Sequence, residues 1–322
     1  MSDKPIAQNE QLEPKRAINR VDMTKWQWTM RQMRVYKVGY LMVAPFFLIF
    51  AVFTILPVVL SLFFSFTIFN LLEWPKFIFL DNYIRLLLDD DIFLLAVKNT
   101  LVFAAVTGPI GYILSFVMAW FINELSPRIR ALVTLIFYAP SISGQVFMIW
   151  QILFHSDQYG YANSILLRFN FIQEPILFFQ NAKFTMPLCI VVALWLSLGT
   201  SFLAFIAGLN IVDRTYYEAG AVDGVKNRWQ ELWYITLPLM KSQLMFGAVM
   251  QITASFGFGG IVTALCGFPS VDYSAHTIMH HLQDYGGMRF EMGYASAIAT
   301  LLFFLMIGAN LVVNRLLAKV GT

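Results

Sequence analysis

The sequence predicts an all-α membrane protein with six transmembrane helices, and two observations carry that prediction. Of the 322 residues, 58% are hydrophobic and only 13% are charged, whereas a typical soluble domain is about 25% charged. The mean hydropathy is +0.66, and six long runs contain no Asp, Glu, Lys or Arg. Because a transmembrane helix needs about 20 mostly apolar residues, each run is long enough to cross a bilayer.

The same composition excludes several classes of protein. A disordered chain, a fibrous repeat and an ordinary cytosolic enzyme are all too poor in apolar residues. The net charge of +3 does not favour nucleic-acid binding. Cys189 and Cys266 both lie in apolar runs, so they predict neither a disulfide framework nor a zinc cluster.

The N-terminal segment divides into two parts. Residues 1–24 are polar and are expected to form a disordered cytoplasmic tail. Within residues 25–37, Trp26, Met30 and Met33 recur at helical spacing among Lys and Arg residues. That pattern is typical of an amphipathic helix lying on a membrane surface; a solvated basic flank is the alternative.

Residues 38–322 are expected to form one membrane domain. The first run carries Pro45 and Pro57 and is too long for a simple crossing, so a kink, tilt or outward extension is expected. The six runs are Val38–Leu72, Asn99–Asn123, Ala131–His155, Phe184–Val212, Ser242–Val271 and Met292–Asn314.

The basic residues predict the orientation. With six crossings, both termini and the loops near Arg128 and at 213–241 share one side, which holds sixteen of the 22 Lys and Arg residues. The positive-inside rule places that side in the cytoplasm. The expected location is therefore the bacterial cytoplasmic (inner) membrane, with several crossings.

Loop 213–241 has more local structure than a linker needs. Thr215 followed by Glu218 reads as a capping box that starts a helix, and Gly224 suits the left-handed residue that ends one. Asn227 is expected to cap a second helix, whose apolar face is Trp229, Leu232 and Trp233. Pro238 is expected to open the fifth span. On these residues alone, Glu218 serves either as a cap or as a contact for a partner.

This loop resembles the EAA loop of binding-protein-dependent ABC importer permeases, in the carbohydrate branch. The two departures are Gly220 in place of the second alanine and one extra residue before Ile235. The segments around Asp81, Asn99, Pro140 and Gly293 resemble other parts of such permeases. The residues that match the EAA pattern are Glu218, Ala219, Gly220, Asp223, Gly224, Ile235, Leu237 and Pro238.

The resemblance implies a fold and partners. The fold is that of a type I ABC importer permease with cytoplasmic coupling helices, similar to the first permease of maltose or glycerol-3-phosphate importers. The partners are a second homologous permease, two ABC ATPases and an extracytoplasmic solute-binding protein. Because the chain lacks the G-x-x-x-x-G-K-[ST] phosphate loop, ATP and Mg belong on the ATPase, and this chain is a transport subunit rather than an enzyme.

Uncharged polar residues in the runs are the candidates for the substrate pathway. A neutral sugar requires hydroxyl-matching groups and aromatic faces, although such residues more often bond to neighbouring helices. Gln251 and Ser255 share one face of the fifth run. The candidates are Gln145, Trp150, Gln151, Gln251, Thr253 and Ser255.

The sequence offers three alternatives to import: a metal site, ion-coupled transport and an intramembrane enzyme. His276, His280 and Asp284 follow helical spacing and could approach a metal, but three ligands without a fourth favour a polar external helix, and no metal is expected. An ion-coupled secondary transporter of a small polar solute is the alternative function. It usually needs ionisable residues within the spans, and the six runs contain no Asp, Glu, Lys or Arg. An intramembrane enzyme would need catalytic groups there as well.

Overall fold

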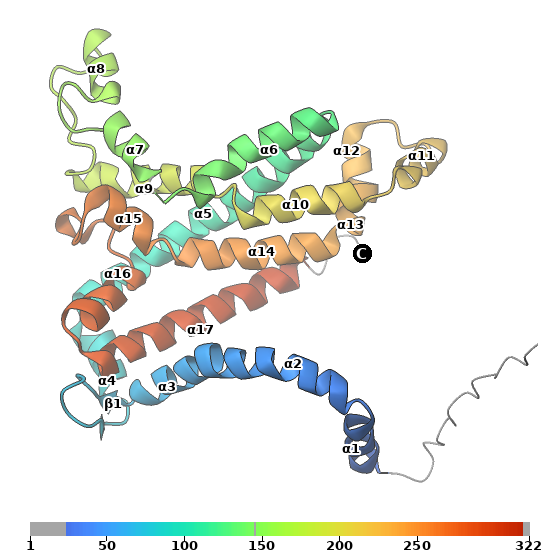
Figure 1. Ribbon diagram of the computed structural model, residues 1–322. Helices are drawn as coiled ribbons and strands as arrows, with labels where there is room; N and C mark the ends of the chain where they lie inside the picture. Colours follow the sequence, from blue (N-terminus) through green and yellow to red (C-terminus); the bar gives the residue numbers. More distant parts are fainter. Residues whose placement is uncertain (1–23, 145, 318–322) are drawn as a thin grey trace, which may run out of the picture. The chain divides into compact units, whose positions relative to one another are not determined.

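The computed structural model describes residues 24–144 and 146–317, and these form helices joined by short segments (Figure 1). The chain divides into two compact units, Met1–Val59 and Leu60–Thr322. The expected disordered tail, residues 1–24, lies outside the described residues except for Thr24.

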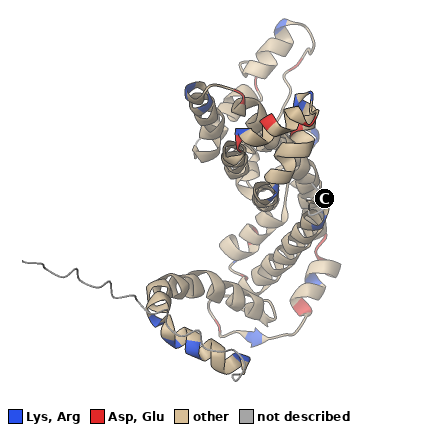
Figure 2. Ribbon diagram, turned by 90° about the vertical axis from the view of Figure 1, so that its right-hand side faces the viewer, with Lys and Arg blue, Asp and Glu red and all other residues tan. Residues whose placement is uncertain are grey.

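The first unit holds α1 (Lys25–Val35), α2 (Lys37–Phe50), η2 (Ala51–Ile55) and the start of α3 (Leu56–Phe64). Thr24 caps α1 through a capping box with Gln27. A π-helical turn precedes Pro57, as expected where proline removes the donor to the carbonyl four residues earlier. Figure 2 shows basic residues along α1, while the long helices carry few charges. That α1 lies on a membrane surface stays a prediction.

The helix formed by the first apolar run, Val38–Leu72, ends before the run itself does. Helix α3 stops at Phe64, and β1 (Thr67–Ile68) then pairs antiparallel with β2 (Lys76–Phe77). Just after the helix, the carbonyls of Ser65 and Thr67 accept hydrogen bonds from the Asn82 side chain, both at 2.9 Å. In the loop between the strands, the Asn70 side chain accepts from the backbone of Leu72 and Glu73, which forms an Asx-type turn. This small hairpin was not expected in an all-α chain.

The segment after the hairpin leads into the longest helix, α5 (Asp91–Asn123), through α4 (Asp81–Ile84) and η3 (Arg85–Asp89). The helix begins before the charge-free run that starts at Asn99. Asp90 accepts a hydrogen bond from the Phe93 backbone at 2.9 Å and so caps the helix eight residues earlier.

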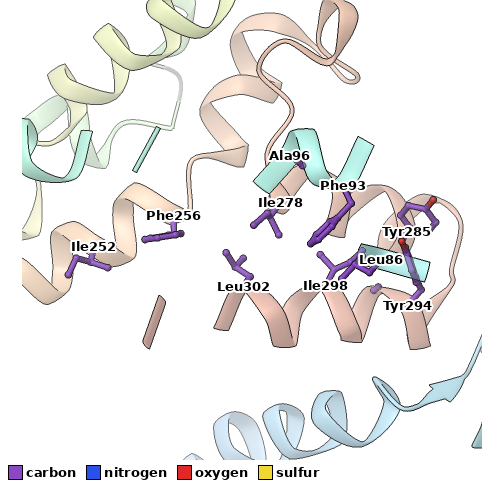
Figure 3. Close-up of a cluster of buried hydrophobic side chains, with 11 residues drawn as sticks. Leu86, Phe93, Ala96, Ile252, Phe256, Ile278, Tyr285, Tyr294, Ile298 and Leu302 are labelled. Atoms are coloured by element: carbon purple, nitrogen blue, oxygen red, sulfur yellow. The ribbon is translucent and has the colours of Figure 1, made fainter. Parts of the chain in front are cut away.

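Helices α5, α10 (Thr200–Ile211) and α14 (Lys241–Phe256) pack on one another, and α17 (Met292–Leu317) packs on α14 (Figure 1). Phe116, Phe202, Phe205 and Leu244 bury one cluster among them. A second cluster, which includes Phe93, Ile278 and Ile298, fills the end near α4 (Figure 3). Within a bilayer such contacts are stabilised by van der Waals packing rather than by transfer out of water, because lipid tails are as apolar as these side chains.

The second unit contains further helical elements. They are α6 (Pro127–Ile142), α7 (Phe147–Leu153), α8 (Tyr161–Arg168), α9 (Ala182–Leu196), α11 (Arg214–Val222), α12 (Arg228–Glu231), η4 (Leu232–Thr236), α13 (Leu237–Leu239), α15 (Gly259–Cys266), η5 (Val271–Tyr273), α16 (Ile278–Gln283) and η6 (Asp284–Met288).

Four helical segments of the described chain are long and apolar enough to cross a membrane, and up to six if each bent pair counts as one span. The four are Lys37–Phe64, Asp91–Asn123, Ala182–Ile211 and Met292–Leu317. The pair α14 and α15 bends by 41° between Phe256 and Gly259, within the glycine-rich stretch 257–260. The all-helical membrane architecture is therefore confirmed, while the count of six stays a prediction.

Candidate functional site

The loop 213–241 folds into two helical pieces joined by a turn. Its first helix, α11, is capped by Asp213, whose Oδ1 accepts from the Thr215 backbone N–H at 3.0 Å. The expected capping box of Thr215 and Glu218 is wrong, because Asp213 is an equally good cap and comes first. Glu218 therefore lies inside α11, exposed, and without a hydrogen-bond or ion-pair partner among the described residues.

The end of α11 is fixed by a left-handed glycine. Gly224 has φ +96°, and the Val225 N–H donates to the Gly220 carbonyl at 2.9 Å. Together with the longer bond from Gly224 N–H to the Ala221 carbonyl, this is the Schellman arrangement. The sequence expectation for Gly224 is confirmed, and Asp223 is the exposed residue just before it.

Gly220 lies close to the segment that follows α11. A Cβ at position 220 would lie 2.6 Å from Ile235 Cδ1, so an alanine there requires Ile235 to move. One turn earlier, the Tyr217 hydroxyl is 3.0 Å from Thr236 Oγ1. Gly220 and Ile235 therefore hold α11 against η4, while Ala219 stays exposed.

The second helix is capped as the sequence indicates. The Asn227 side chain accepts from the Gln230 N–H at 2.9 Å. The expected apolar face is only partly buried: Leu232 is buried, whereas Trp229 and Trp233 are exposed. The Trp229 ring lies 5.3 Å from the Trp120 ring of α5.

Leu237 and Pro238 lie in the short helix α13, and both are half-buried. The expectation that Pro238 opens the fifth span is wrong. A turn at Met240 separates α13 from α14, which begins at Lys241. Pro238 still occupies a first helical turn, where a missing N–H costs least.

A polar cavity of about 850 Å³ lies beside α11, and the ends of α5 and α6 also line it. Glu218 and Tyr217 line it from α11, together with Arg228, Glu124 and Arg130. Arg228 donates to both Glu124 and Glu231 at 2.7 Å. The hydrogen bond to Glu231 is the largest cause that raises the pKa of Arg228. The cavity thus presents both signs of charge beside an unpaired glutamate.

Two of the pathway candidates are buried between helices. Gln251 Nε2 donates to the Thr107 carbonyl of α5, and Gln251 Oε1 accepts from Ser201 of α10, both at 3.2 Å. Ser255 is also buried and donates to the Ile252 carbonyl of its own helix. Gln251 and Ser255 do share one face, as expected, but that face packs against α5 and α10.

The other described pathway candidates lie on α14 and α7. Thr253 is exposed on α14. Gln151 donates to the Ala264 carbonyl at 2.6 Å, which links α7 to α15. Trp150 stacks on Phe154 with 5.8 Å between ring centroids. Gln145 lies outside the described residues.

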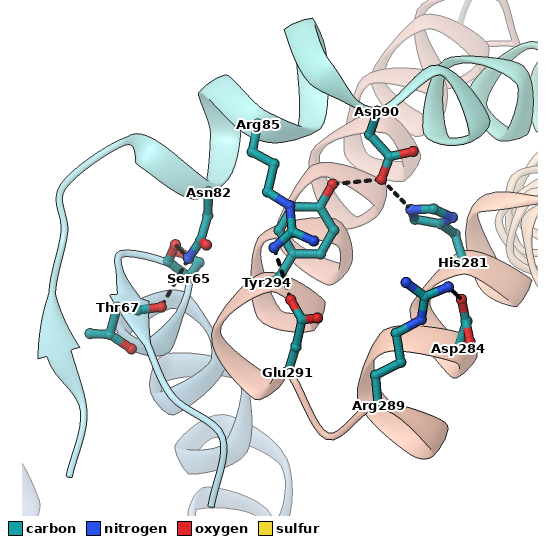
Figure 4. A network of polar contacts seen from close by, with 10 residues as sticks. All are labelled: Ser65, Thr67, Asn82, Arg85, Asp90, His281, Asp284, Arg289, Glu291 and Tyr294. Atoms are coloured by element: carbon teal, nitrogen blue, oxygen red, sulfur yellow. Dashed lines mark hydrogen bonds and ion pairs between the residues drawn. The ribbon is translucent and has the colours of Figure 1, made fainter. Parts of the chain in front are cut away.

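The histidines of α16 belong to a buried network that the sequence did not predict. His281 Nε2 is 2.9 Å from Asp90 Oδ2, and the Tyr294 hydroxyl donates to the same oxygen at 2.8 Å (Figure 4). Asp284, considered as a metal ligand, instead pairs with Arg289 at 2.6 Å. Burial is the main cause that lowers the pKa of His276, to about 4. In the described chain, no group of three or more His, Cys, Asp or Glu residues is arranged to hold a metal.

Comparison with known proteins places these features in a family. Residues 93–321 match the family described as "Binding-protein-dependent transport system inner membrane component". The probable ABC transporter permease protein YesP of Bacillus subtilis (strain 168) is 32% identical over 275 residues, covering 81% of this chain and 84% of that protein. The lactose transport system permease protein LacF of Rhizobium radiobacter is 31% identical over 228 residues, covering 70% and 74%.

Two solved structures share the fold. One is a bacterial ABC transporter involved in the import of the acidic polysaccharide alginate, with a TM-score of 0.73 and 22% identity, covering 92% of this chain and all of that one. The other is a bacterial alginate ABC transporter in complex with an alginate pentasaccharide-bound periplasmic protein, with a TM-score of 0.74 and 21% identity, covering 91% and 98%.

Proposed function

The chain belongs to the family of inner membrane components of binding-protein-dependent transport systems, and from that premise we propose that it forms half of the translocation pathway of an ATP-driven carbohydrate importer. The family makes it a transporter subunit rather than an enzyme. A second homologous permease, two ABC ATPases with their ATP and Mg, and an extracytoplasmic binding protein would complete the importer. Six crossings with both termini in the cytoplasm are part of the proposal.

The observation that carries the coupling role is the construction of α11. The helix is capped at both ends and held against η4 by Gly220, yet Glu218, Ala219 and Asp223 remain exposed. A short, narrow helix with an unpaired charge can enter a pocket on a partner protein, here called the socket. The charge can then form an ion pair across the interface, because it is not already neutralised within this chain. We assign this socket to the ATPase.

A carbohydrate substrate is supported by the relatives and by the composition of the spans. One relative is named a lactose permease and another an arabinooligosaccharide permease. The six apolar runs of this chain contain no Asp, Glu, Lys or Arg, which fits an uncharged, hydroxyl-rich solute better than ion coupling. Of the pathway candidates on α14, Thr253 is exposed, whereas Gln251 and Ser255 would act by holding α14 in place.

The test is reconstitution of the chain with its three kinds of partner in proteoliposomes. Uptake of lactose, arabinotriose and alginate pentasaccharide is measured with and without Mg·ATP, alongside ATP hydrolysis. Glu218→Lys should leave the assembled complex in the membrane but uncouple hydrolysis from uptake, because the reversed charge no longer matches the ATPase socket. Glu174→Lys, at an exposed glutamate outside the loop, is the matched control. Full uptake by Glu218→Lys contradicts the coupling role of α11.

A further inference from the structure

Loop 213–241, here called the coupling loop, contacts α5 at two neighbouring points. Arg228, the first residue of α12, bridges Glu231 of its own helix and Glu124, the residue that follows the last turn of α5. Next to it, the Trp229 ring lies against Trp120. Trp120 and Glu124 are four residues apart and therefore face the same side of α5, so two adjacent residues of α12 contact one stripe of α5.

The second half of the loop, α12 and η4, also contacts α11. Tyr217 contacts Thr236, and Gly220 packs against Ile235. Both partners belong to η4, which continues directly from α12. A displacement of α11 is therefore transmitted to η4 and α12 through these contacts. It is transmitted from α12 to α5 through Arg228 and Trp229.

The ion pair between Arg228 and Glu124 contributes little to the stability of the fold. The side chains of Arg228 and Glu124 are 61% and 45% exposed, and exposed ion pairs contribute little to folding. Their positions, however, are specific: they join residues 104 apart in the sequence. A contact that is weak in stability but fixed in geometry suits a role in orientation.

We propose that Arg228 and Glu124, together with Trp229 and Trp120, are positioning residues that make α11 and α5 move as one body, so that the ATPase stroke is delivered to the pathway through α5. The inference rests on the proposed function, because it presumes that α11 is the segment the ATPase moves. Helix α5 is suited to receive the motion, since it packs on both α10 and α14, and Thr107 of α5 binds Gln251 of α14.

The test uses the complete transporter with two nitroxide labels in a background without Cys189 and Cys266. One label replaces Val222 at the end of α11 and the other replaces Phe121 of α5; both side chains are exposed in this chain. In the otherwise unaltered complex, the distance between the labels should be the same with and without Mg·ATP. In Glu124→Arg it should change or broaden on adding Mg·ATP, because Arg228 then faces a like charge.

Transport per ATP is the second readout, for whichever of lactose, arabinotriose or alginate pentasaccharide the unaltered complex imports. Coupling free energies between sites usually correspond to roughly 5–150-fold effects, so Glu124→Arg should lower uptake per ATP by about five-fold while basal hydrolysis persists. Combining it with Arg228→Glu should restore most of the loss, because Arg at 124 then faces carboxylates at 228 and 231. Reversal of the external pair Glu73 and Lys76, 3.0 Å apart and exposed, is the matched control.

The outcomes separate the two claims. If the unaltered complex shows no ATP-driven uptake and its α11 does not contact the ATPase, the proposed function fails. If the unaltered complex transports, and Glu124→Arg keeps both its fixed label distance and its uptake per ATP, only the positioning role of this pair is overturned. Failure of the charge-reversed double variant to regain either readout also overturns it.

Discussion

At the scale of single residues, three buried histidines make the α16 region sensitive to acid. His276, His280 and His281 are each at most 2% exposed. Burial is the largest cause that lowers the pKa of His276 and of His280, each to about 4. Burial also lowers the pKa of His281, although the neighbouring Asp90 opposes it. The groups around them carry both signs: Asp90, Asp284 and Arg289, with Arg85 and Glu291 bonded to each other nearby (Figure 4).

The sign of the pH dependence follows from these pKa values. Above about pH 6.5 these histidines are neutral in both the folded and unfolded chain, so the region keeps its full stability. As the pH falls from about 6.5 to 4, the unfolded chain binds protons at His276 and His280 that the folded chain does not, which costs about 1.4 kcal/mol per pH unit for each of these two residues. The contribution of Asp90 to stability is lost at a lower pH than that of the histidines. Burial would raise the pKa of that carboxyl, but hydrogen bonds from Phe93, Tyr294 and His281 keep it below its ordinary value. Its contribution is lost only as the pH falls through that lowered value.

We therefore predict that α16 loosens between pH 7 and pH 5. Hydrogen exchange of the backbone amides of Ile278–Gln283, corrected for the intrinsic effect of pH, should accelerate over this interval. His280→Gln should flatten the dependence by removing one of the titrating groups. Ser242→Ala, away from the network, should leave it unchanged. Protection that is equal at both pH values in the unaltered protein contradicts the prediction.

At the scale of an element, Gly224 tests whether the geometry of α11 depends on one backbone angle. No heavy atom lies within 4 Å of a Cβ built at this position, so a substitution there costs conformational energy without a clash. Alanine in the left-handed region costs about 1–2 kcal/mol, whereas asparagine adopts that region more readily. Gly224→Ala should therefore fray the end of α11 more than Gly224→Asn does.

The measurement for Gly224 is hydrogen exchange at the amides of Asp223, Gly224 and Val225, whose acceptors lie in the last turn of α11. Uptake per ATP should fall in the same order, with alanine worse than asparagine. Equal exchange in both variants and the unaltered chain would show that α11 is held by its contacts with η4 alone.

The elements also show how far a sequence determines this fold. Helix α17 begins at Met292 as expected, and α14 begins within one residue of the expected start, because a bilayer demands long uncharged runs. The end of α3 and the start of α5 were missed, since Asn82 and Asp90 act through side-chain hydrogen bonds rather than through hydropathy.

The candidate site was predictable only where its interactions are local. Gly224 and Asn227 were identified because turn and cap chemistry involve neighbouring residues. The pairing of Arg228 with Glu124, or of His281 with Asp90, gives no signal in a single sequence, because the partners are 104 and 191 residues apart. Periodicity likewise placed Gln251 and Ser255 on one face, but it cannot say which helix that face meets.

At the scale of the whole molecule, the distribution of charge predicts the orientation in the membrane. Sixteen of the 22 Lys and Arg residues lie in the segments expected to share a side with loop 213–241, and such an excess marks the cytoplasmic side. If an ATPase is to contact α11, that helix must face the cytoplasm. Orientation is thus the premise on which the coupling proposal depends.

Single cysteines test this orientation in a chain without Cys189 and Cys266, expressed without partner subunits that could cover the sites. Val222, 88% exposed at the end of α11, should react with a membrane-impermeant maleimide only after the cells are lysed. Tyr159, 80% exposed in the segment between α7 and α8, should react in intact cells. The pair is informative because the two sites flank the span Ala182–Ile211, so a single crossing must place them on opposite sides. Labelling of Val222 in intact cells would put α11 outside, where no ATPase could reach it.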